Sequence, residues 1–370
     1  MKLLKQITIA VVLVAGLLAM LSYWVFRLPV FGAEASAARL LRMQQSKQVH
    51  GARFENTPPY VSNFSTLREL QAYLGDEHRE PAFKIPVVSI PADSLNPAIA
   101  SGLRAWWLGH ASVMIEIDGV RILTDPMLSE RASPFQFIGP ARLHPVPLAL
   151  ESWKNVDAVV ISHDHFDHLD MDSIQQLAKG GTHFYVGLGI GAHLEKWAVN
   201  PAQIHEMDWW EVADIKGVKI HCTPARHYSG RTSMNNSTLW ASWMVKGPNH
   251  SAYFSGDSGY AEHFKAIRER LGAADLSLIK VGAYGDTWLD IHMSPEAAIQ
   301  AHLDLGARTM LPVHWATFNL AYHDWTEPIL RTLAAAKSKD AQVITPRVGE
   351  QFDFSVPFVN QAWYLPTGRE

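Results

Sequence analysis

The chain has 370 residues, of which 48% are hydrophobic and 18% are charged, a composition typical of a globular protein with a substantial core. Its formal net charge of -4, without any long basic run, argues against a nucleic-acid-binding surface. The single cysteine, Cys222, excludes an intramolecular disulfide. The composition therefore allows one large domain or two ordinary ones, and we expect no nucleic acid as a partner.

The first predicted element is an apolar helix at the N-terminus. Residues 7–26 carry no charge, and as a helix they reach about 30 Å, the thickness of a bilayer core. The alternative is a cleaved signal peptide, for which residues 33–35 offer a small-residue site. Because the apolar run is longer than a usual signal-peptide core, we expect residues 1–27 to be an uncleaved transmembrane anchor. The rest of the chain would then face the periplasm or the exterior.

Residues 28–100 follow this anchor with recurring prolines and weak periodicity, apart from a helix expected at 67–74. We expect this segment to be a linker and a wrapping arm. Short apolar or alternating runs begin near residue 101. Residues 101–355 are therefore expected to form one domain, with a C-terminal tail at 356–370.

Within that domain, short apolar or alternating runs predict strands, and longer amphipathic runs predict helices. Strands are expected at 103–108, 112–117, 120–124, 156–161, 183–187, 218–222, 238–245, 251–255, 276–280, 308–312 and 341–344. Helices are expected at 171–179, 190–198, 260–270, 294–304 and 327–337. The helix at 294 has a clear start signal, with Ser294 as N-cap before Pro295. The pattern predicts an α/β protein in which sheets pack together and helices cover them outside.

The strand predicted at 156–161 leads into the densest cluster of ionisable residues in the chain. Its pattern is His-x-His-x-Asp-His, at His163, His165, Asp167 and His168. Side chains in such a turn diverge to two sides, so one pair can serve one metal ion and the other pair a second. Imidazole suits zinc, and a carboxylate suits a harder position. The less favoured alternative is a polar turn with a capping aspartate.

Three further candidate ligands occupy the same kind of position, just after a predicted strand. They are His227, Asp257 and His314. Ligands from strand ends can converge on one edge of a sheet, and with the first motif these residues complete two ligand sets. Each of them alone would more often be an ordinary surface or capped residue.

In this order, the motif and the three later residues resemble the metallo-β-lactamase superfamily. The resemblance implies a four-layer αβ/βα sandwich with a dinuclear metal site, here expected to hold two zinc ions. It implies one metal on His163, His165 and His227, a second metal on Asp167, His168 and His314, and Asp257 as the bridge between them.

Neighbouring stretches resemble, within this superfamily, the N-acyl-phosphatidylethanolamine phospholipase D subfamily and its bacterial relatives. They are "WWLGHASVMIEIDGVRILTDPMLSERASPFQFIGPAR" at 106–142, "FSGDSGY" at 254–260, "HMSPEAA" at 292–298 and "VHWATF" at 313–318. The predicted anchor at residues 1–27 gives a single-pass protein of a bacterial inner membrane with its catalytic domain in the periplasm, and the resemblance implies that this domain is a phosphodiesterase. The substrate it implies is a phospholipid of the N-acyl-ethanolamine type.

Several residues are assigned supporting roles. Asp167 and His292 are the expected catalytic residues, and His292 is expected to contact a substrate phosphate or donate a proton; the alternative is a half-buried structural histidine. Asp164 and Asp125 are expected to orient the ligating imidazoles, although Asp125 could equally form a turn before Pro126. Asp170 fits the same role or a helix N-cap. His110, in a tight turn after a strand, is expected to be structural.

Two other functions are compatible with the same ligands. The first is a lactonase or another ester or amide hydrolase, since a metal-activated water attacks carbonyl carbon as readily as phosphorus. The second is a non-catalytic metal-binding protein of the envelope, which the His and Asp ligands disfavour because structural zinc sites usually use cysteine. The expected partners are a phospholipid or small-molecule ester and the membrane. The sequence is also compatible with a homo-oligomer.

Overall fold

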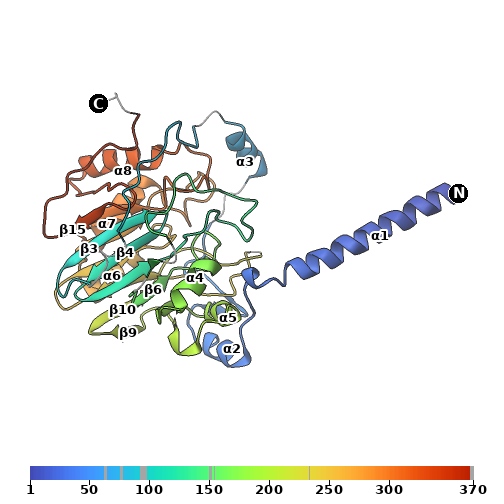
Figure 1. Cartoon of the computed structure of the whole chain (residues 1–370), viewed down its shortest axis with the longest axis horizontal. Coiled ribbons are helices and arrows are strands. Elements are labelled where there is room, and N and C mark those ends of the chain that lie inside the picture. The colour runs from blue at the N-terminus through green and yellow to red at the C-terminus, as the bar shows by residue number, and fades with distance from the viewer. Residues whose placement is uncertain are drawn as a thin grey trace.

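The computed structural model describes residues 1–61, 65–75, 78–91, 98–149, 152–153, 155–232 and 234–366. Two β-sheets pack face to face, and helices cover their outer faces, as Figure 1 shows. A long N-terminal helix, α1 (Lys2–Val25), projects from this body. The four layers agree with the sandwich expected from the sequence.

The 7-stranded sheet has the order β15-β3-β4-β5-β6-β7-β8. Its strands are β3 (Leu103–Gly109), β4 (Ser112–Ile117), β5 (Val120–Thr124), β6 (Ala158–Ile161), β7 (His183–Gly187), β8 (Ile204–Met207) and β15 (Gln351–Asp353). The strands from β15 to β5 pair antiparallel, and those from β5 to β8 pair parallel. The loops that follow the parallel strands therefore meet at one edge of the sheet.

The 6-stranded sheet has the order β14-β13-β12-β11-β10-β9. Its strands are β9 (Val212–Ile215), β10 (Val218–Thr223), β11 (Ser242–Lys246), β12 (Ser251–Phe254), β13 (Leu276–Lys280) and β14 (Thr309–Val313). The strands from β9 to β12 pair antiparallel, while β12, β13 and β14 pair parallel. This sheet also carries several strand ends to one edge.

The core lies between the sheets and beneath the helices. Alternate residues of β3 belong to different apolar clusters: Ala105 and Trp107 face the other sheet, whereas Trp106 and Leu108 join the helix-covered face. A strand buried on both faces reads as a continuous apolar run, which explains why β3 was predicted correctly. Trp107 also stacks on Trp315 across the core, with 5.4 Å between ring centroids.

Helices close the outer layers. They are α4 (Met171–Ala178) and α5 (Gly191–Lys196) on the 7-stranded sheet, and α6 (His263–Leu271), α7 (Pro295–Leu305) and α8 (Glu327–Ser338) on the other side. Ser294 caps α7 by accepting a hydrogen bond from the N–H of Ala297, as its sequence predicts.

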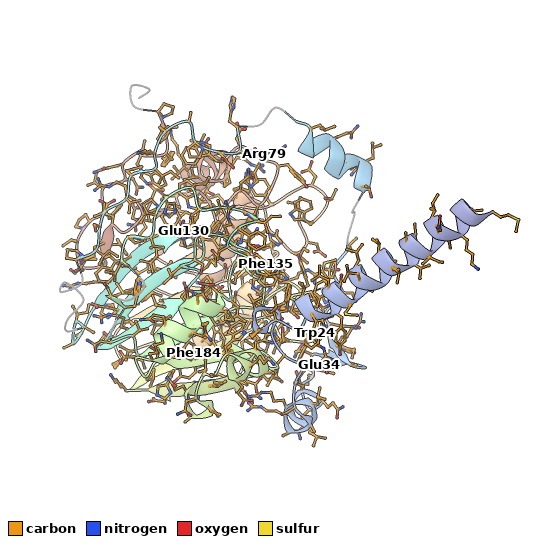
Figure 2. The ribbon with its side chains drawn as sticks, turned by 45° about the vertical axis from the view of Figure 1, so that its right-hand side comes forward. Trp24, Glu34, Arg79, Glu130, Phe135 and Phe184 are labelled. Atoms are coloured by element: carbon orange, nitrogen blue, oxygen red, sulfur yellow. The ribbon has the colours of Figure 1, made fainter. Side chains whose placement is uncertain are left out.

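The N-terminal helix α1 is exposed from Leu4 to Trp24, and its side chains stand clear of the body in Figure 2. By length and composition, residues Leu4–Val25 are long and apolar enough to cross a membrane; a signal sequence near an N-terminus meets the same criteria. The arm that follows contains short elements. They are η1 (Pro29–Phe31), α2 (Ala37–Met43), β1 (Val49–His50), β2 (Arg53–Phe54) and α3 (Thr66–Tyr73).

This arm is attached to the body by specific polar contacts. Arg39 of α2 forms ion pairs of 2.7 Å with both Glu195 and Glu206. Further along, the Asn56 amide donates to the carbonyl of His227 at 2.7 Å and accepts from the N–H of the same residue at 3.1 Å. The arm thus passes beside one of the predicted metal ligands.

Some predicted elements differ from the structure. The strand expected at 341–344 is wrong, because only an isolated bridge between Met310 and Val343 forms there. The strand expected at 238–245 begins at Ser242, and the short elements α2, β8, β9 and β15 were not predicted.

Within the segment expected as a C-terminal tail, Trp363 is buried and stacks on Trp315, with 5.2 Å between ring centroids. This part of the tail belongs to the core.

Candidate metal centre

The predicted ligands come together at one edge of the sandwich, although they are up to 151 positions apart in the chain. The His-x-His-x-Asp-His motif follows β6, and His227 follows β10. Asp257 follows β12, and His314 follows β14 directly. Because each strand ends at the same edge, the loops deliver these side chains to a single buried cluster.

The first group of ligand atoms consists of three imidazole nitrogens. His163 Nε2 lies 2.7 Å from His165 Nδ1, and His227 Nε2 lies 3.4 Å from the same atom. Two nitrogen lone pairs at this distance repel each other unless a proton or a cation lies between them. This geometry, with all three nitrogens within 4.8 Å of one another, fits a metal ion held by three histidines.

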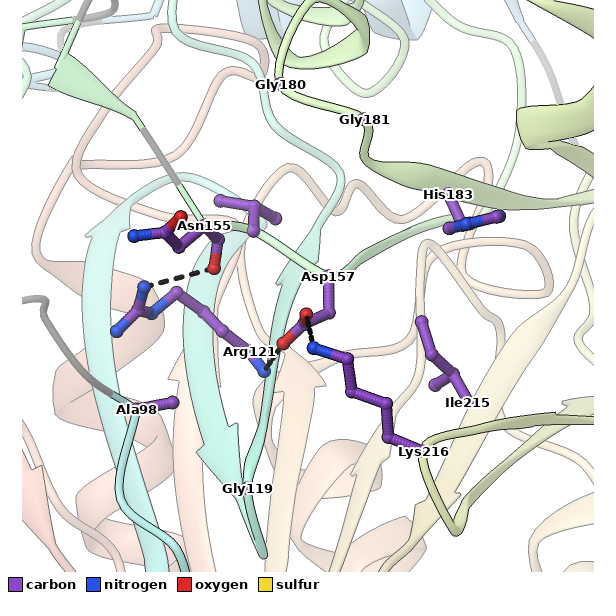
Figure 3. A pocket seen from close by; sticks show the side chains of 11 residues that line it. Ala98, Gly119, Arg121, Asn155, Asp157, Gly180, Gly181, His183, Ile215 and Lys216 are labelled. Carbon is purple, nitrogen blue, oxygen red and sulfur yellow. Dashed lines mark hydrogen bonds and ion pairs between the residues drawn. The ribbon is translucent and has the colours of Figure 1, made fainter.

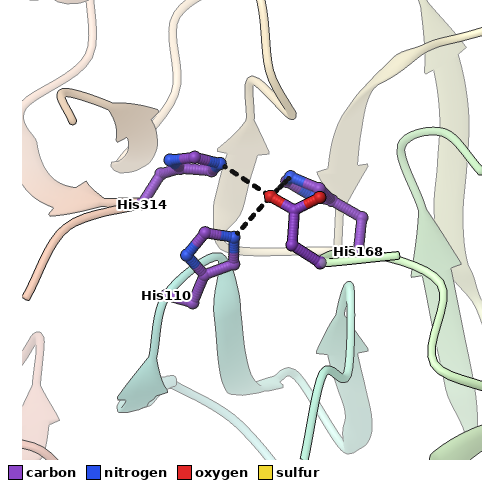
Figure 4. A group of neighbouring side chains, drawn as sticks. His110, His168 and His314 are labelled. Atoms are coloured by element: carbon purple, nitrogen blue, oxygen red, sulfur yellow. Dashed lines mark hydrogen bonds and ion pairs between the residues drawn. The ribbon is translucent and has the colours of Figure 1, made fainter. Parts of the chain in front are cut away.

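The second group mixes imidazole and carboxylate. Asp167 Oδ2 lies 3.3 Å from His168 Nε2 and 3.4 Å from His314 Nε2. Figure 4 shows these two imidazoles converging, together with that of His110. The donor set is harder than the first group, which agrees with the second ligand set expected from the sequence.

Asp257 lies between the two groups. Its Oδ2 is 3.0 Å from His314 Nε2 and 3.3 Å from His168 Nε2, and its carboxylate also clusters with His227. Its Oδ1 is buried and has no hydrogen-bond partner among the described residues. Burial opposes ionisation, but His314 and His168 outweigh it and hold the pKa of Asp257 well below its usual range. A charged carboxylate with a spare oxygen fits a bridging ligand.

Hydrogen bonds behind the cluster fix the histidine tautomers. His168 Nδ1 donates to Asp125 Oδ2 at 2.7 Å, and His227 Nδ1 donates to the Ile291 carbonyl at 3.2 Å. His163 Nδ1 donates to Ser162 Oγ at 2.9 Å, and that hydroxyl donates onward to Asp125. Each of these imidazoles therefore keeps an Nε2 lone pair for a metal.

The two aspartates expected to orient imidazoles thus have different positions. Asp125 contacts His168 directly and His163 through Ser162. Asp164 accepts from the N–H of Gly230 at 2.7 Å and lies 3.4 Å from His193 Nε2, so it supports the loop rather than a predicted ligand. Asp164 was expected to contact a ligating imidazole, and in the structure it contacts His193 and Gly230 instead.

Asp170 is the N-cap of α4, where its side chain accepts from the N–H of Ser173. It also accepts a hydrogen bond from Ser129 Oγ at 2.8 Å. The N-cap alternative for this residue is confirmed.

His110 was expected to be structural, but the structure places it at the cluster. Its Nε2 lies 3.1 Å from Asp167 Oδ2, and its ring centroid lies 4.0 Å from that of His314. Burial, and next the neighbouring His314, lower the pKa of His110 to about 3, so the ring is neutral. The available signal was its position just after β3, which matches the position of the other ligands after their strands.

Lys280 was also missed. It is the last residue of β13 and is fully buried, and its Nζ has no hydrogen-bond partner among the described residues. Burial lowers its pKa to about 7 against the opposing effect of Asp257 and Asp167. The sequence signal that could have identified Lys280 is its position at the end of a predicted apolar strand.

His292, an expected catalytic residue, lies at the edge of the cluster. Its Nε2 is 3.9 Å from Asp257 Oδ2, and its ring centroid is 5.0 Å from that of His227. Its Nδ1 is buried without a hydrogen-bond partner among the described residues. The residue therefore offers a polar atom next to the cluster.

The cluster forms the floor of a cavity of about 400 Å³. The floor is ionisable and includes His165, Asp167, Asp257, His292 and His314. The walls are largely apolar or aromatic, and they contain Tyr60, Tyr228, Met234, Trp288, Ile291 and Leu320. A polar floor below apolar walls suits a substrate with a reactive polar centre and an apolar portion.

A larger hollow lies elsewhere on the body, and Figure 3 shows its lining. Its ionic groups have protein partners: Asp157 pairs with Lys216 at 2.6 Å and accepts from the backbone N–H of Arg121 at 2.8 Å, and the guanidinium of Arg121 pairs with Glu116. The groups of potential metal ligands found among the described residues all lie outside it. The reactive chemistry therefore belongs to the cluster at the other edge.

Comparisons with known proteins agree with this geometry. The family model of the beta-lactamase superfamily domain matches residues 120–315. The chain is 44% identical over 340 residues to an uncharacterized protein of Mycobacterium tuberculosis, covering 90% of this chain and 91% of that protein. It is 36% identical over 293 residues to N-acyl-phosphatidylethanolamine-hydrolyzing phospholipase D 1 of Caenorhabditis elegans, covering 73% of this chain and 81% of that protein.

A solved structure shares the fold. It is Igni18, a metallo hydrolase from the archaeon Ignicoccus hospitalis, with a TM-score of 0.55 and 22% identity, covering 70% of this chain and 100% of that one. Across this distance the likeness concerns the arrangement of sheets and helices.

Proposed function

Because this chain belongs to the metallo-β-lactamase superfamily, we propose that it is a membrane-anchored hydrolase with two zinc ions that cleaves a phosphodiester bond in an N-acyl-phosphatidylethanolamine type of phospholipid. The superfamily and the sandwich fold predicted from the sequence are confirmed, and the protein is a metal-dependent hydrolase of that fold. The single observation that carries the phospholipid substrate is the likeness to the C. elegans enzyme over 81% of its length.

In this proposal, His163, His165 and His227 hold the first metal. The second is held by Asp167, His168 and His314, with Asp257 as the bridge. The orphaned Oδ1 of Asp257 and the Nε2 lone pairs left by the tautomers support this assignment. Bound metal ions of this kind lower the pKa of water and stabilise negative charge on a phosphate.

The protein residues supply orientation. Asp125 fixes the imidazoles of His168 and, through Ser162, of His163. In the proposed reaction, His292 contacts a substrate phosphate or gives a proton to the leaving oxygen, and the position of its Nε2, 3.9 Å from Asp257 Oδ2, supports this role. The apolar cavity walls receive the lipid portion and keep water away from the floor. Asp167 is both a metal ligand and a catalytic residue on the cavity floor.

The remaining assignments complete the proposal. Residues 1–27 anchor the chain in a bacterial inner membrane, residues 28–100 form the linker and wrapping arm, and residues 101–355 form the catalytic domain in the periplasm. The exposed apolar helix α1 and the contacts of the arm with the body support this arrangement. A tethered domain suits a substrate that resides in the bilayer.

Hydrolysis by the full chain tests the proposal. The substrates are N-acyl-phosphatidylethanolamine, unmodified phosphatidylethanolamine, a p-nitrophenyl phosphodiester and a lactone, and metal content is measured on the same samples. We expect zinc-dependent release of phosphatidic acid from the N-acylated lipid. His165→Ala should abolish it, whereas His221→Ala, on β10 outside the cluster, should leave it unchanged. Lactone hydrolysis without phosphodiesterase activity would overturn the phospholipase assignment and keep the metal site.

A further inference from the structure

A series of aromatic rings connects the end of α1 with an exposed loop of the body. Phe26 contacts Phe31 with 5.3 Å between ring centroids, and Phe31 contacts Phe135 at 6.0 Å. Phe135 stacks on Phe137 at 5.3 Å. Phe137 is 81% exposed, and its neighbour Ile138 is 59% exposed. Adjacent large apolar side chains in water mark an interaction surface.

The loop that carries these two residues has a defined conformation. Arg131 and Ala141 form an isolated antiparallel bridge at its base. Within the loop, the N–H of Arg131 donates to Gln136 Oε1 at 3.0 Å, and its guanidinium donates to the Gly139 carbonyl at 2.5 Å. These contacts hold Phe137 and Ile138 at the tip, so their exposure is a property of the folded loop.

The segment between α1 and the body is also held in place. Trp197 Nε1 donates to the carbonyl of Pro29 at 2.6 Å, and Arg231 Nε donates to the carbonyl of Val30 at 2.9 Å. The N–H of Ala33 donates to His193 Nδ1 at 2.9 Å. Because three backbone groups within residues 29–33 are bound by the body, the loop keeps a fixed position relative to the end of α1.

We propose that Phe26, Phe137 and Ile138 form a docking surface that enters the interface of the bilayer spanned by α1. Phe26 follows the apolar helix directly, so it lies at the interface, where aromatic side chains are favoured. The ring contacts continue from there to Phe137. The inference rests on the proposed anchoring by α1, but not on the proposed metal chemistry or substrate.

This docking would bring the cavity next to the lipids. Phe166, between the cavity residues His165 and Asp167, contacts the Phe31 ring at 6.0 Å. The guanidinium of Arg231 lies 4.1 Å from the Phe166 ring centroid. Three positions beyond Arg231, the cavity residue Met234 is 67% exposed. A lipid could therefore reach the floor from the bilayer along an apolar rim.

Fluorescence quenching in vesicles tests the docking surface. The full chain is reconstituted in phosphatidylcholine vesicles with an environment-sensitive dye on one introduced cysteine. The variants are Phe137→Cys at the loop tip, Val14→Cys inside α1, and Val212→Cys as the control on exposed β9, which lies away from α1 in Figure 1. The native Cys222 is buried and does not compete for the dye.

We expect lipids brominated on their acyl chains to quench the dyes at positions 137 and 14, with a blue shift of emission, and to leave position 212 unchanged. Quenching at 14 but not at 137 would overturn the docking surface and keep the anchor. A dye at 14 that is not quenched would overturn the anchor and the docking surface together. Equal quenching at 137 and 212 would overturn a specific surface. Because no turnover is measured, a wrong substrate assignment does not affect these outcomes.

Discussion

His110 donates a hydrogen bond of 3.1 Å from its Nε2 to Asp167 Oδ2. The backbone of His110 is also part of the site, because its carbonyl accepts from the N–H of His314 at 2.9 Å. Its own N–H donates to Thr317 Oγ1 at 2.6 Å. One residue thus connects two predicted ligands of the second metal, and it lies at a φ of 53° that few side chains adopt. We infer that His110 positions Asp167.

Replacing His110 with alanine should therefore weaken the second metal more than the first. Loss of a hydrogen bond behind a metal ligand typically lowers metal affinity or activity by about 10–100-fold. We expect a loss of that size in kcat/KM and in affinity for one metal equivalent, measured by calorimetric titration of the metal-free protein. His110→Asn, which tolerates the same backbone conformation and keeps an N–H donor, should recover part of the loss. Equal weakening of both metals would contradict a selective role at Asp167.

Asp125 offers a second test, because it supports histidines from both groups. It accepts from His168 directly and from Ser162, which in turn accepts from His163. Asp125→Asn keeps the size of the side chain but removes its charge and one acceptor. We expect the affinity for both metals to fall by about 10–100-fold. The control is Asp172→Asn on α4, where the side chain is exposed, and this variant should bind metal as the original protein does.

Metal removal should lower stability as well as activity. The cluster buries the carboxylates of Asp167 and Asp257 beside several imidazoles, so chelation leaves only these imidazoles to balance the buried negative charges. A ligand that binds only the folded state stabilises it by about 4 kcal/mol when its concentration is about 1,000 times Kd. We expect chelation to lower Tm and zinc to restore it. An unchanged Tm would argue against a tightly bound metal at this site.

The part of the site that follows strand ends could be predicted from the sequence. His163, His227 and His314 each come after an apolar run, and parallel strands deliver such residues to one edge. His110 was assigned a structural role although it follows β3 directly, because its contact with Asp167, from the loop after β6, depends on tertiary packing that a sequence does not display. Asp164 was misplaced because its partner, His193, comes from α5, a contact that depends on tertiary packing.

The fold shows the same division. The strands β3 to β6 were predicted because both of their faces are buried, so their sequences are mainly apolar. The edge strands β8 and β9 were missed, since they are only partly buried and contain polar residues such as His205 and Asp214. Strand β15 is three residues long and forms only by pairing with β3 from far away in the chain.

Asp118 permits a prediction of stability against pH at a position remote from the metal centre. It lies in the turn between β4 and β5 and accepts hydrogen bonds from the backbone N–H groups of Gly102, Asn249 and His250. Its carboxylate also lies 2.9 Å from His250 Nδ1. Partial burial opposes ionisation, but the Asn249 N–H and His250 outweigh it and lower the pKa of Asp118 to about 2.

Because the folded-state pKa lies below the usual value of 3.8, the charged form of Asp118 stabilises the fold above that value. This contribution should be lost as the pH falls from 3.8 towards 2. Asp118→Asn should therefore lower the free energy of unfolding by about 2 kcal/mol at neutral pH, and by less in acid. Denaturant titrations at several pH values measure the difference. The matched control is Asp340→Asn. Asp340 is exposed, and its φ of 53° is similar to the φ of 46° at Asp118, so its replacement should change stability little at any pH. A stability difference for Asp118→Asn that stays constant down to the acid range would show that hydrogen bonding, rather than charge, is what this carboxylate contributes.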